Sequence, residues 1–313
     1  MSAFTSVALI ANPASRRGAR LQARAVAAFA RAGVRCELLL TERPGHAAEL
    51  ARGCDGRHEA VFVLGGDGTV MEVAGALAYS GVPVGVLAGG TGNLLARAVG
   101  IPLGIERAIA ALLGGTRLRI DLGRLEGGRR FAVAAGVGID ARMVAGTPGW
   151  MKRRLGVLAY ALVATRASLG AVLGRERFTA RITVDGETIE RRAIAVMVAN
   201  FGAVLADRIT LGPGIEGDDG VLDVCVFSPR TLGDALRIMR RMMAKDFGSD
   251  DCLLYRSGRR IRVDTDPVGP TQADGELLGE TPFEVEVEPR AVELLIPRAA
   301  PGAARRDGRA VGN

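Results

Sequence analysis

The run VFVLGGDGTVME at residues 61–72 constrains the fold more than any other part of this sequence. Its first four residues are apolar, as in a parallel strand buried on both faces, and the apolar residues beyond Thr69 suit a helix. Between them, closely spaced glycines let the backbone turn sharply and approach a ligand. Thr69 and Glu72 have the spacing of a capping box, so we expect Thr69 to cap the helix. The run predicts a strand, a tight turn and a helix.

The turn within this run has the chemistry of a phosphate site. Backbone N–H groups at the start of a helix point toward a bound anion and favour phosphate. Asp67 adds a carboxylate where a phosphate-bound Mg2+ needs one. Many strand–helix turns contain glycine without binding any ligand, so this interpretation depends on the segments around the turn.

The length and charge of the chain set broad limits on its function. With 313 residues, the chain is long enough for two domains that each bury a core. Aromatic residues make up only 4%, which argues against a base-stacking platform, and we expect no nucleic-acid partner. The net charge of +7 is almost entirely arginine, because the only lysines are Lys152 and Lys245. Such a surface favours binding of phosphates or anionic lipid headgroups. The alternative is that the arginines are simply solvated and bind no partner.

The cysteines and histidines do not form a metal or disulfide pattern. No C-x-x-C spacing occurs, so we expect neither a zinc site nor a disulfide framework. We therefore expect the protein to lie in the reducing cytosol. The first residues run directly into a strand pattern, so we expect no signal peptide. The longest apolar span, residues 155–173, contains Arg166 and does not suit a transmembrane helix. The residues concerned are Cys36, Cys54, Cys225, Cys252, His46 and His58.

Strands and helices alternate in the first third of the chain. The expected strands are residues 6–11, 36–41, 61–64 and 83–88, and the expected helices include residues 15–32, 45–52 and 104–114. This alternation predicts a doubly wound parallel sheet, whose ligands lie at the carboxyl ends of the strands. Asn12, Thr41, the turn at 65–69 and the glycine-rich turn at 89–93 all fall at those ends.

From about residue 117 the pattern changes to strands joined by tight turns. The pair Asp185-Gly186, between alternating flanks, is a strong hairpin signal. The expected strands are residues 117–122, 131–137, 178–184, 193–201, 221–227, 252–256, 259–264 and 281–288, with helices at 150–173 and 231–246. The predicted fold class is thus an α/β nucleotide domain plus a mostly antiparallel β-rich domain. The predicted division is 1–118 for the first domain, 119–290 for the second, 291–298 for a strand returning to the first, and 299–313 for a disordered basic tail.

Five motifs in order resemble the diacylglycerol kinase catalytic-domain family, in particular its bacterial lipid-kinase branch, over about residues 5–297. They are NPAS at 12–15, GGDGTVME at 65–72, GGTGNLLAR at 89–97, GDDGVLDV at 217–224 and ADGE at 273–276. The resemblance implies an NAD kinase/diacylglycerol kinase-like fold, the use of ATP and Mg2+, and transfer of the γ-phosphate to a lipid hydroxyl. Met71 and the pair Leu94-Leu95 depart from the family pattern, and they put the identity of the acceptor in doubt.

The resemblance also implies an ATP site at the first glycine turn. There the phosphates lie on Gly66, Gly68 and Thr69, with Asp67 near the catalytic Mg2+. On the residues alone, Asp67 could also be a turn-stabilising aspartate and Thr41 an ordinary strand-end threonine. The implied nucleotide-binding residues are Asn12, Thr41, Gly65, Gly66, Asp67, Gly68, Thr69, Glu72 and Thr91.

Two acidic segments downstream are the other candidates for chemistry. A kinase needs a proton acceptor near the attacking hydroxyl, and Asp274 and Glu276 flank a glycine in a sequence that also suits a hairpin turn. The resemblance implies that one of them is the proton acceptor, and we favour Glu276. It further implies a second Mg2+ held by Asp219 and by the carbonyls of Glu216 and Val221, where a polar surface turn is the alternative.

The expected function is therefore an ATP-dependent lipid kinase, in the cytoplasm and peripheral at the inner face of the membrane. Residues 150–154 (WMKRR) have the aromatic and cationic character of a membrane-interface segment. The alternatives are an NAD kinase, which shares the GGDGT motif, and a nucleotide-binding regulator without catalysis. The pattern of apolar residues identifies neither the lipid acceptor nor the oligomeric state.

Overall fold

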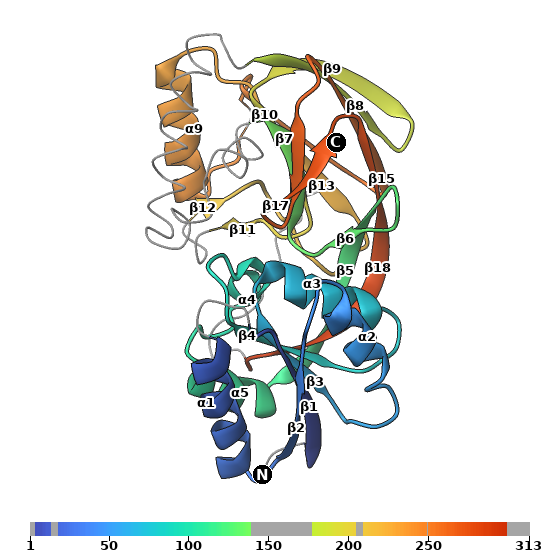
Figure 1. Cartoon of the computed structure of the whole chain (residues 1–313). Helices are drawn as coiled ribbons and strands as arrows, with labels where there is room; N and C mark the ends of the chain where they lie inside the picture. Colours follow the sequence, from blue (N-terminus) through green and yellow to red (C-terminus); the bar gives the residue numbers. More distant parts are fainter. Residues whose placement is uncertain (1–3, 14–17, 139–176, 205–208, 249, 299–313) are drawn as a thin grey trace.

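The computed structural model describes residues 4–13, 18–138, 177–204, 209–248 and 250–298, and it consists of two stacked domains (Figure 1). The first domain contains β1 (Ser6–Ala11), α1 (Gly18–Arg31), β2 (Arg35–Leu40), α2 (His46–Arg52), β3 (Val61–Gly65), α3 (Asp67–Ala76), β4 (Val84–Ala88), α4 (Leu94–Ala98) and α5 (Ile105–Leu113). The second contains β6 (Arg130–Phe131), β7 (Ala134–Gly138), β8 (Phe178–Val184), β9 (Glu187–Ala193), β10 (Ala195–Ala199), β11 (Ala203–Val204), β12 (Ile209–Thr210), β13 (Leu222–Phe227), α9 (Leu232–Ala244), β14 (Leu253–Gly258), β15 (Arg260–Asp266), β16 (Pro270–Ala273) and β17 (Glu276–Glu280). Two long strands, β5 (Thr116–Leu125) and β18 (Phe283–Ile296), belong to both.

The first domain is built on the parallel strand order β2-β1-β3-β4, which confirms the predicted doubly wound sheet. Strands β1 and β3 are apolar and buried because helices cover both faces of the sheet, with α1 and α5 together and α2 and α3 together (Figure 1). Phe29 of α1 packs edge-on against Phe62 of β3, with ring centroids 4.8 Å apart. This packing brings the carboxyl ends of β1, β3 and β4 to one rim.

Strands β5 and β18 connect the two domains as an antiparallel ribbon. Their register runs from Leu125 opposite Val285 to Thr116 opposite Ile296. Near its end β18 also pairs with β4, so one sheet of ten strands continues through both domains. We expected separate strands at 281–288 and 291–298, but the structure joins them through an irregularity at which Arg290 adopts a φ of 49°.

The second domain is a sandwich of antiparallel strands, as the turn-rich sequence predicts. Its second sheet has the order β14-β13-β10-β7-β16-β17. Alternate residues of the two sheets, including Phe131, Ile182 and Val224, meet in a buried apolar cluster. The Asp185-Gly186 hairpin joins β8 to β9, with both residues at positive φ, which confirms that prediction.

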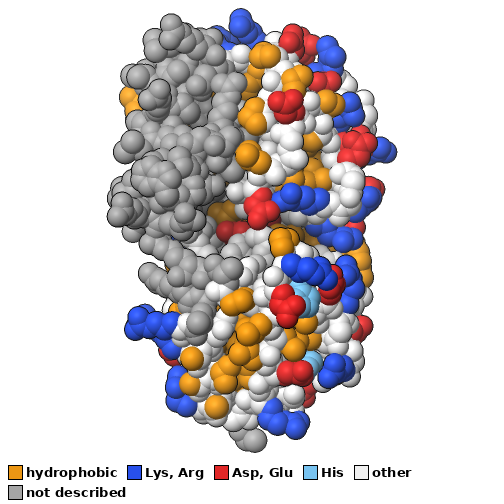
Figure 2. Space-filling model, viewed as in Figure 1, with side chains coloured by type: hydrophobic (Ala, Val, Ile, Leu, Met, Phe, Trp, Pro, Cys, Tyr) orange, Lys and Arg blue, Asp and Glu red, His pale blue; other side chains and the backbone are white. Residues whose placement is uncertain are grey.

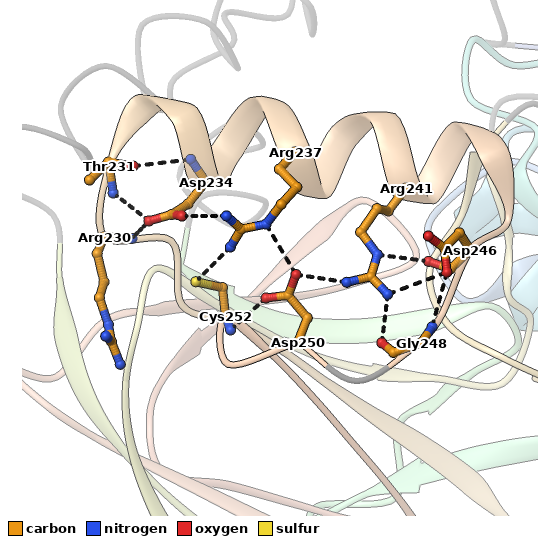
Figure 3. A network of polar contacts seen from close by, with 9 residues as sticks. All are labelled: Arg230, Thr231, Asp234, Arg237, Arg241, Asp246, Gly248, Asp250 and Cys252. Carbon is orange, nitrogen blue, oxygen red and sulfur yellow. Dashed lines mark hydrogen bonds and ion pairs between the residues drawn. The ribbon is translucent and has the colours of Figure 1, made fainter.

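Helix α9 lies on the outer face of this second sheet and is held there by ion pairs. Figure 3 shows Arg237 and Arg241 pointing from one side of α9 toward Asp250 in the following loop. Their nitrogens lie 3.2 and 2.8 Å from the Asp250 carboxylate. Thr231 and Asp234 form a capping box at the start of the helix. The capping box thus defines where the helix begins, and the ion pairs hold one side of it to the loop before β14.

Two expected features lie outside the described residues: the helix at 150–173, with its interfacial segment 150–154, and the tail at 299–313. Among the helices that the structure describes, none has the length and apolar character needed to cross a bilayer.

Replacement of Gly85 by alanine is expected to destabilise the first domain. A Cβ on Gly85 of β4 would lie 2.5 Å from ring carbons of Phe62, whose position is fixed by the core around it. Such overpacking costs about 1–3 kcal/mol of unfolding free energy. Gly114→Ala is the control, because its φ is −98° and its Cβ would meet only the Ala110 carbonyl at an ordinary 3.5 Å, so it is expected to be close to neutral. Urea denaturation of both variants measures the difference, and equal stability would contradict the packing argument.

Candidate active site

The glycines of the two sequence motifs pack against each other at the rim of the parallel sheet. Gly89 donates its N–H to the carbonyl of Gly65 at 2.9 Å. A Cβ on Gly90 would lie 2.7 Å from the Cα of Gly66, so neither turn tolerates a side chain where they meet. Part of the glycine pattern that we attributed to a ligand thus serves the close approach of these two turns.

Asp67 locks the two turns together at the first residue of α3. Its carboxylate accepts the backbone N–H of Asn93 at 2.9 Å and of Leu94 at 2.6 Å. Burial raises the pKa of Asp67, and the nearby charge of Glu276 raises it further. The two hydrogen bonds oppose this rise in pKa. Asn93 in turn exchanges side-chain hydrogen bonds with the backbone of Gly90, at 2.9 and 3.0 Å.

The predicted capping box at Thr69 and Glu72 is wrong. Helix α3 begins earlier, at Asp67 with Gly66 as its N-cap, and no side-chain cap is present. Glu72 instead accepts the N–H groups of Gly45 and Ala47 at the start of α2, at 3.0 and 3.2 Å. A carboxylate at a helix N-terminus is electrostatically favourable there. Glu72 therefore fixes the loop before α2 beside the site.

The side chain of Asp274 organises the second domain's share of the site. Its carboxylate accepts the backbone N–H groups of Ala132, Val133 and Ala134 at 2.7, 2.9 and 3.1 Å. Because these N–H groups turn toward a carboxylate, the strand that we expected at 131–137 is divided into β6 and β7. Burial raises the pKa of Asp274 to about 6, and the charge of Asp67 contributes to the rise. The three hydrogen bonds favour the carboxylate and lower the pKa, but burial has the larger effect.

Glu276 follows in the same β16–β17 hairpin, whose turn residues Asp274 and Gly275 have φ values of 45° and 80°. The Asp-Gly pair thus forms the hairpin turn that was the alternative interpretation, and that turn carries both acids into the cleft. The Glu276 carboxylate pairs with Arg129 at 2.5 Å and lies against Gly68 so closely that a Cβ on Gly68 would overlap it.

These groups line one cleft of about 400 Å³ between the domains. Figure 2 shows acidic and basic side chains meeting at this waist of the molecule. The lining residues are Pro44, Asp67, Gly68, Met71, Glu72, Arg129, Arg130, Ala273, Asp274 and Glu276. The structure therefore brings the GGDGT turn and the D-G-E acids together, although about 200 residues separate them in the sequence.

The remaining predicted nucleotide residues lie along the same rim. Asn12, after β1, donates its amide to the hydroxyl of Thr69 at 3.4 Å. Thr41 follows β2, donates its N–H to Ala11 and has a buried side chain. Thr91 lies in the turn that Asp67 holds, and is partly exposed. Their contact with a nucleotide stays a prediction.

Hydrogen bonds to aspartate side chains of the protein hold the loop that we predicted to bind a second metal ion. Asp219 accepts the N–H of Val221 at 3.1 Å, and the buried Asp121 accepts the N–H of Gly220 at 2.6 Å. Among the described residues, no three or more acidic, histidine or cysteine side chains are grouped to hold a metal ion. The metal role of Glu216, Asp219 and Val221 stays a prediction.

Sequence reasoning missed two residues of the cleft and one residue beside the predicted metal loop. Arg129 and Arg130 line the cleft beside the acids, and Asp121 holds both the loop at Gly220 and the N–H of Arg290 at 2.6 Å. The two arginines follow a pair of glycines at positive φ in the β5–β6 turn. That Gly-Gly pair signals a turn, but nothing local shows that the turn faces the cleft.

The donor set of the cleft fits a Mg2+ ion bound together with phosphate. Mg2+ takes one or two carboxylates and completes its coordination with phosphate oxygens and water, so a cage of several carboxylates is not required. Asp67 and Glu276 are near enough for the charge of Glu276 to raise the pKa of Asp67. A cation bound at Asp67 would relieve this repulsion, with phosphate oxygens and water completing its coordination.

Comparisons with known proteins agree with this architecture. The family model described as the diacylglycerol kinase catalytic domain matches residues 6–125, and that described as the YegS C-terminal NAD kinase beta sandwich-like domain matches residues 132–296. A protein of Staphylococcus epidermidis with the name "Putative lipid kinase" is 27% identical over 241 residues, which are 76% of each chain. An uncharacterized protein of Synechocystis is 32% identical over 242 residues, 76% of this chain; the match spans about half of that relative, 54%.

The fold also has relatives among solved structures. A diacylglycerol kinase from Bacillus anthracis superposes with a TM-score of 0.71, over 95% of this chain and 98% of that chain, at 22% identity. At this identity the likeness concerns the fold. The two family matches confirm the resemblance: this chain belongs to the diacylglycerol kinase catalytic-domain family, and its second domain is of the YegS type.

The pKa of Asp274 predicts a measurable pH dependence of stability. Its folded-state pKa of about 6 lies above the ordinary value of 3.8, so the folded state binds the proton more tightly. This contribution to stability is complete below about pH 4 and is lost as the pH rises through 6. The unfolding free energy of the wild type minus that of Asp274→Asn should therefore fall by about 3 kcal/mol between about pH 3 and pH 7. Urea denaturation across the range measures it, and a constant difference would contradict the raised pKa.

Proposed function

We propose that this protein is an ATP-dependent lipid kinase that uses Mg2+ and transfers the γ-phosphate of ATP to a lipid hydroxyl. One observation carries the proposal: the acids of the β16–β17 turn face Asp67 and the glycine turn across a single cleft. Phosphoryl transfer requires mainly positioning and charge neutralisation, and a proton acceptor at the hydroxyl. The membership of a kinase family supports the same reaction.

The two acids of the hairpin have different surroundings, which suggests different roles. Asp274 is buried and its oxygens are occupied by three backbone N–H groups, so it holds the hairpin and keeps its charge close to Asp67. The Glu276 side chain is 52% exposed to the cleft and can receive the proton of an incoming hydroxyl. Glu276 is therefore our proton acceptor.

The first domain supplies the binding side of the reaction. The N-terminus of α3, with Gly66, Gly68 and Thr69, presents backbone N–H groups that orient phosphate oxygens. Asp67 would hold Mg2+ together with the phosphate oxygens, and the ion supplies neutralisation of the phosphate charge when bound. Glu72 keeps the loop before α2 beside the phosphates. Because the proposed acceptor is a lipid, the protein would act at a membrane surface.

Loss of either acid is expected to abolish transfer. Asp67→Ala and Glu276→Ala should each lower incorporation of radioactive phosphate from ATP into a total lipid extract by roughly 100-fold or more, because metal positioning or proton removal is lost. Glu190→Ala, an exposed carboxylate in the β8–β9 hairpin, is the control and should retain activity. Full activity in both site variants would show that the site is assigned wrongly.

The same assay separates the alternatives. An NAD kinase would form NADP from NAD and ATP and would leave the lipid extract unlabelled. A non-catalytic regulator would bind ATP and transfer phosphate to neither. Identification of the labelled lipid species would name the acceptor.

The contact between Gly68 and Glu276 gives an independent test. Gly68→Ala would place a methyl group where the Glu276 carboxylate lies, and the flexible glutamate should move away with little loss of stability. Transfer should fall roughly 100-fold, as for loss of a general base. Gly75→Ala in the same helix is the control, because its Cβ would meet Arg130 at an ordinary 3.7 Å. Equal activity of the two variants would mean that the position of Glu276 on α3 is not needed.

A further inference from the structure

Among the residues that the structure describes, the lining of the cleft carries more negative than positive charge. Four carboxyl groups and two guanidinium groups line it. A nucleoside triphosphate would bring several more negative charges to the same space. Such a site requires cations aimed at the phosphates, since a buried negative cluster is otherwise strongly unfavourable.

The two arginines differ in how they are held. Arg130 forms a fork with Glu288 at 2.5 and 3.0 Å and also contacts the carbonyl of Gly75 at 3.4 Å. Its donors are thus used to join the second domain to α3. Arg129 has one ion pair within the part of the chain that the structure describes, between Nη2 and Glu276, and its side chain is 46% exposed.

The backbone of Arg129 is held in the β5–β6 turn, whereas its side chain is partly exposed at the cleft. Its carbonyl accepts the N–H of Leu125 at 2.7 Å, which closes the β5–β6 turn. A guanidinium is planar and presents donors along several edges, so it can hold a carboxylate on one edge and a phosphate on another. The Glu276 carboxylate that it holds lies against Gly68, in the first turn of α3.

We propose that Arg129 is a catalytic residue that binds the terminal phosphate of the nucleotide while it holds Glu276. The pair would fix three groups relative to one another: the phosphate, the proton acceptor and the first turn of α3. This inference rests on the proposed use of ATP and names the residue that distinguishes a triphosphate from a diphosphate. Arg130 serves as a structural brace beside it.

The test compares two nucleotides that differ in the terminal phosphate. Isothermal titration calorimetry with Mg2+ measures the binding of ADP and of a non-hydrolysable ATP analogue with a β,γ-imido bridge. Arg129→Met should raise the Kd of the analogue roughly 10- to 100-fold, since a charge-assisted hydrogen bond is lost, and leave that of ADP unchanged. Arg129→Lys should restore part of the affinity, because the charge returns without the planar fork.

Two further variants make the result specific. Arg260→Met removes an arginine that pairs with Glu284 away from the cleft, and both affinities should stay at the wild-type value. Glu276→Gln removes the partner of Arg129, and affinity for the analogue should be retained. Arg129→Gln replaces Arg129→Met if circular dichroism shows that the latter is unfolded.

Several outcomes would overturn the inference. One is an unchanged Kd for the analogue in Arg129→Met, and another is an equal loss of affinity for both nucleotides in that variant. A third is the same loss of affinity in Glu276→Gln, which would mean that Arg129 acts only through Glu276. The proposed function fails separately, if the wild type binds neither nucleotide or labels no lipid. Discrimination by Arg129 without lipid labelling would support the inference and reject the lipid acceptor.

Discussion

The buried carboxylate of Asp274 is the interaction on which the arrangement of the site depends. Its three backbone hydrogen bonds join the β16–β17 hairpin to the break between β6 and β7 and satisfy the N–H groups there. The hairpin position in turn sets where Glu276 reaches the first domain. Burial of an acid that keeps its hydrogen bonds is costly, and the raised pKa of Asp274 measures that cost.

The rest of the cleft balances charge across the domain boundary. Asp67, held by the second glycine turn, faces the two acids of the hairpin, and Arg129 and Arg130 come from the strand turn beside them. The β5–β18 ribbon runs through both domains, so the two sides of the cleft are connected by continuous hydrogen-bonded strands. A site of this kind can hold like charges close together because the surrounding backbone does not let them separate.

Much of the first domain could be predicted because its signals are local. The apolar runs of β1, β3 and β4 and the glycine turns after them are visible within a few residues, and the Asp185-Gly186 hairpin is equally local. The errors came where a distant group competes with local preference. Glu72 caps a neighbouring helix in place of its own, and the strand at 131–137 is broken by a carboxylate that comes some 140 residues later.

The sequence by itself determined the two kinds of sheet, the rim where the glycine turns lie and, through its ordered motifs, the family. Only the tertiary structure decided that the D-G-E hairpin faces Asp67, that Gly68 accommodates Glu276, and that Arg129 stands beside both. The physical reason is that periodicity reports which face of an element is buried, whereas the meeting of side chains across a cleft depends on how whole domains pack. Arginines in particular look alike in a sequence, whether they are solvated or aimed at a site.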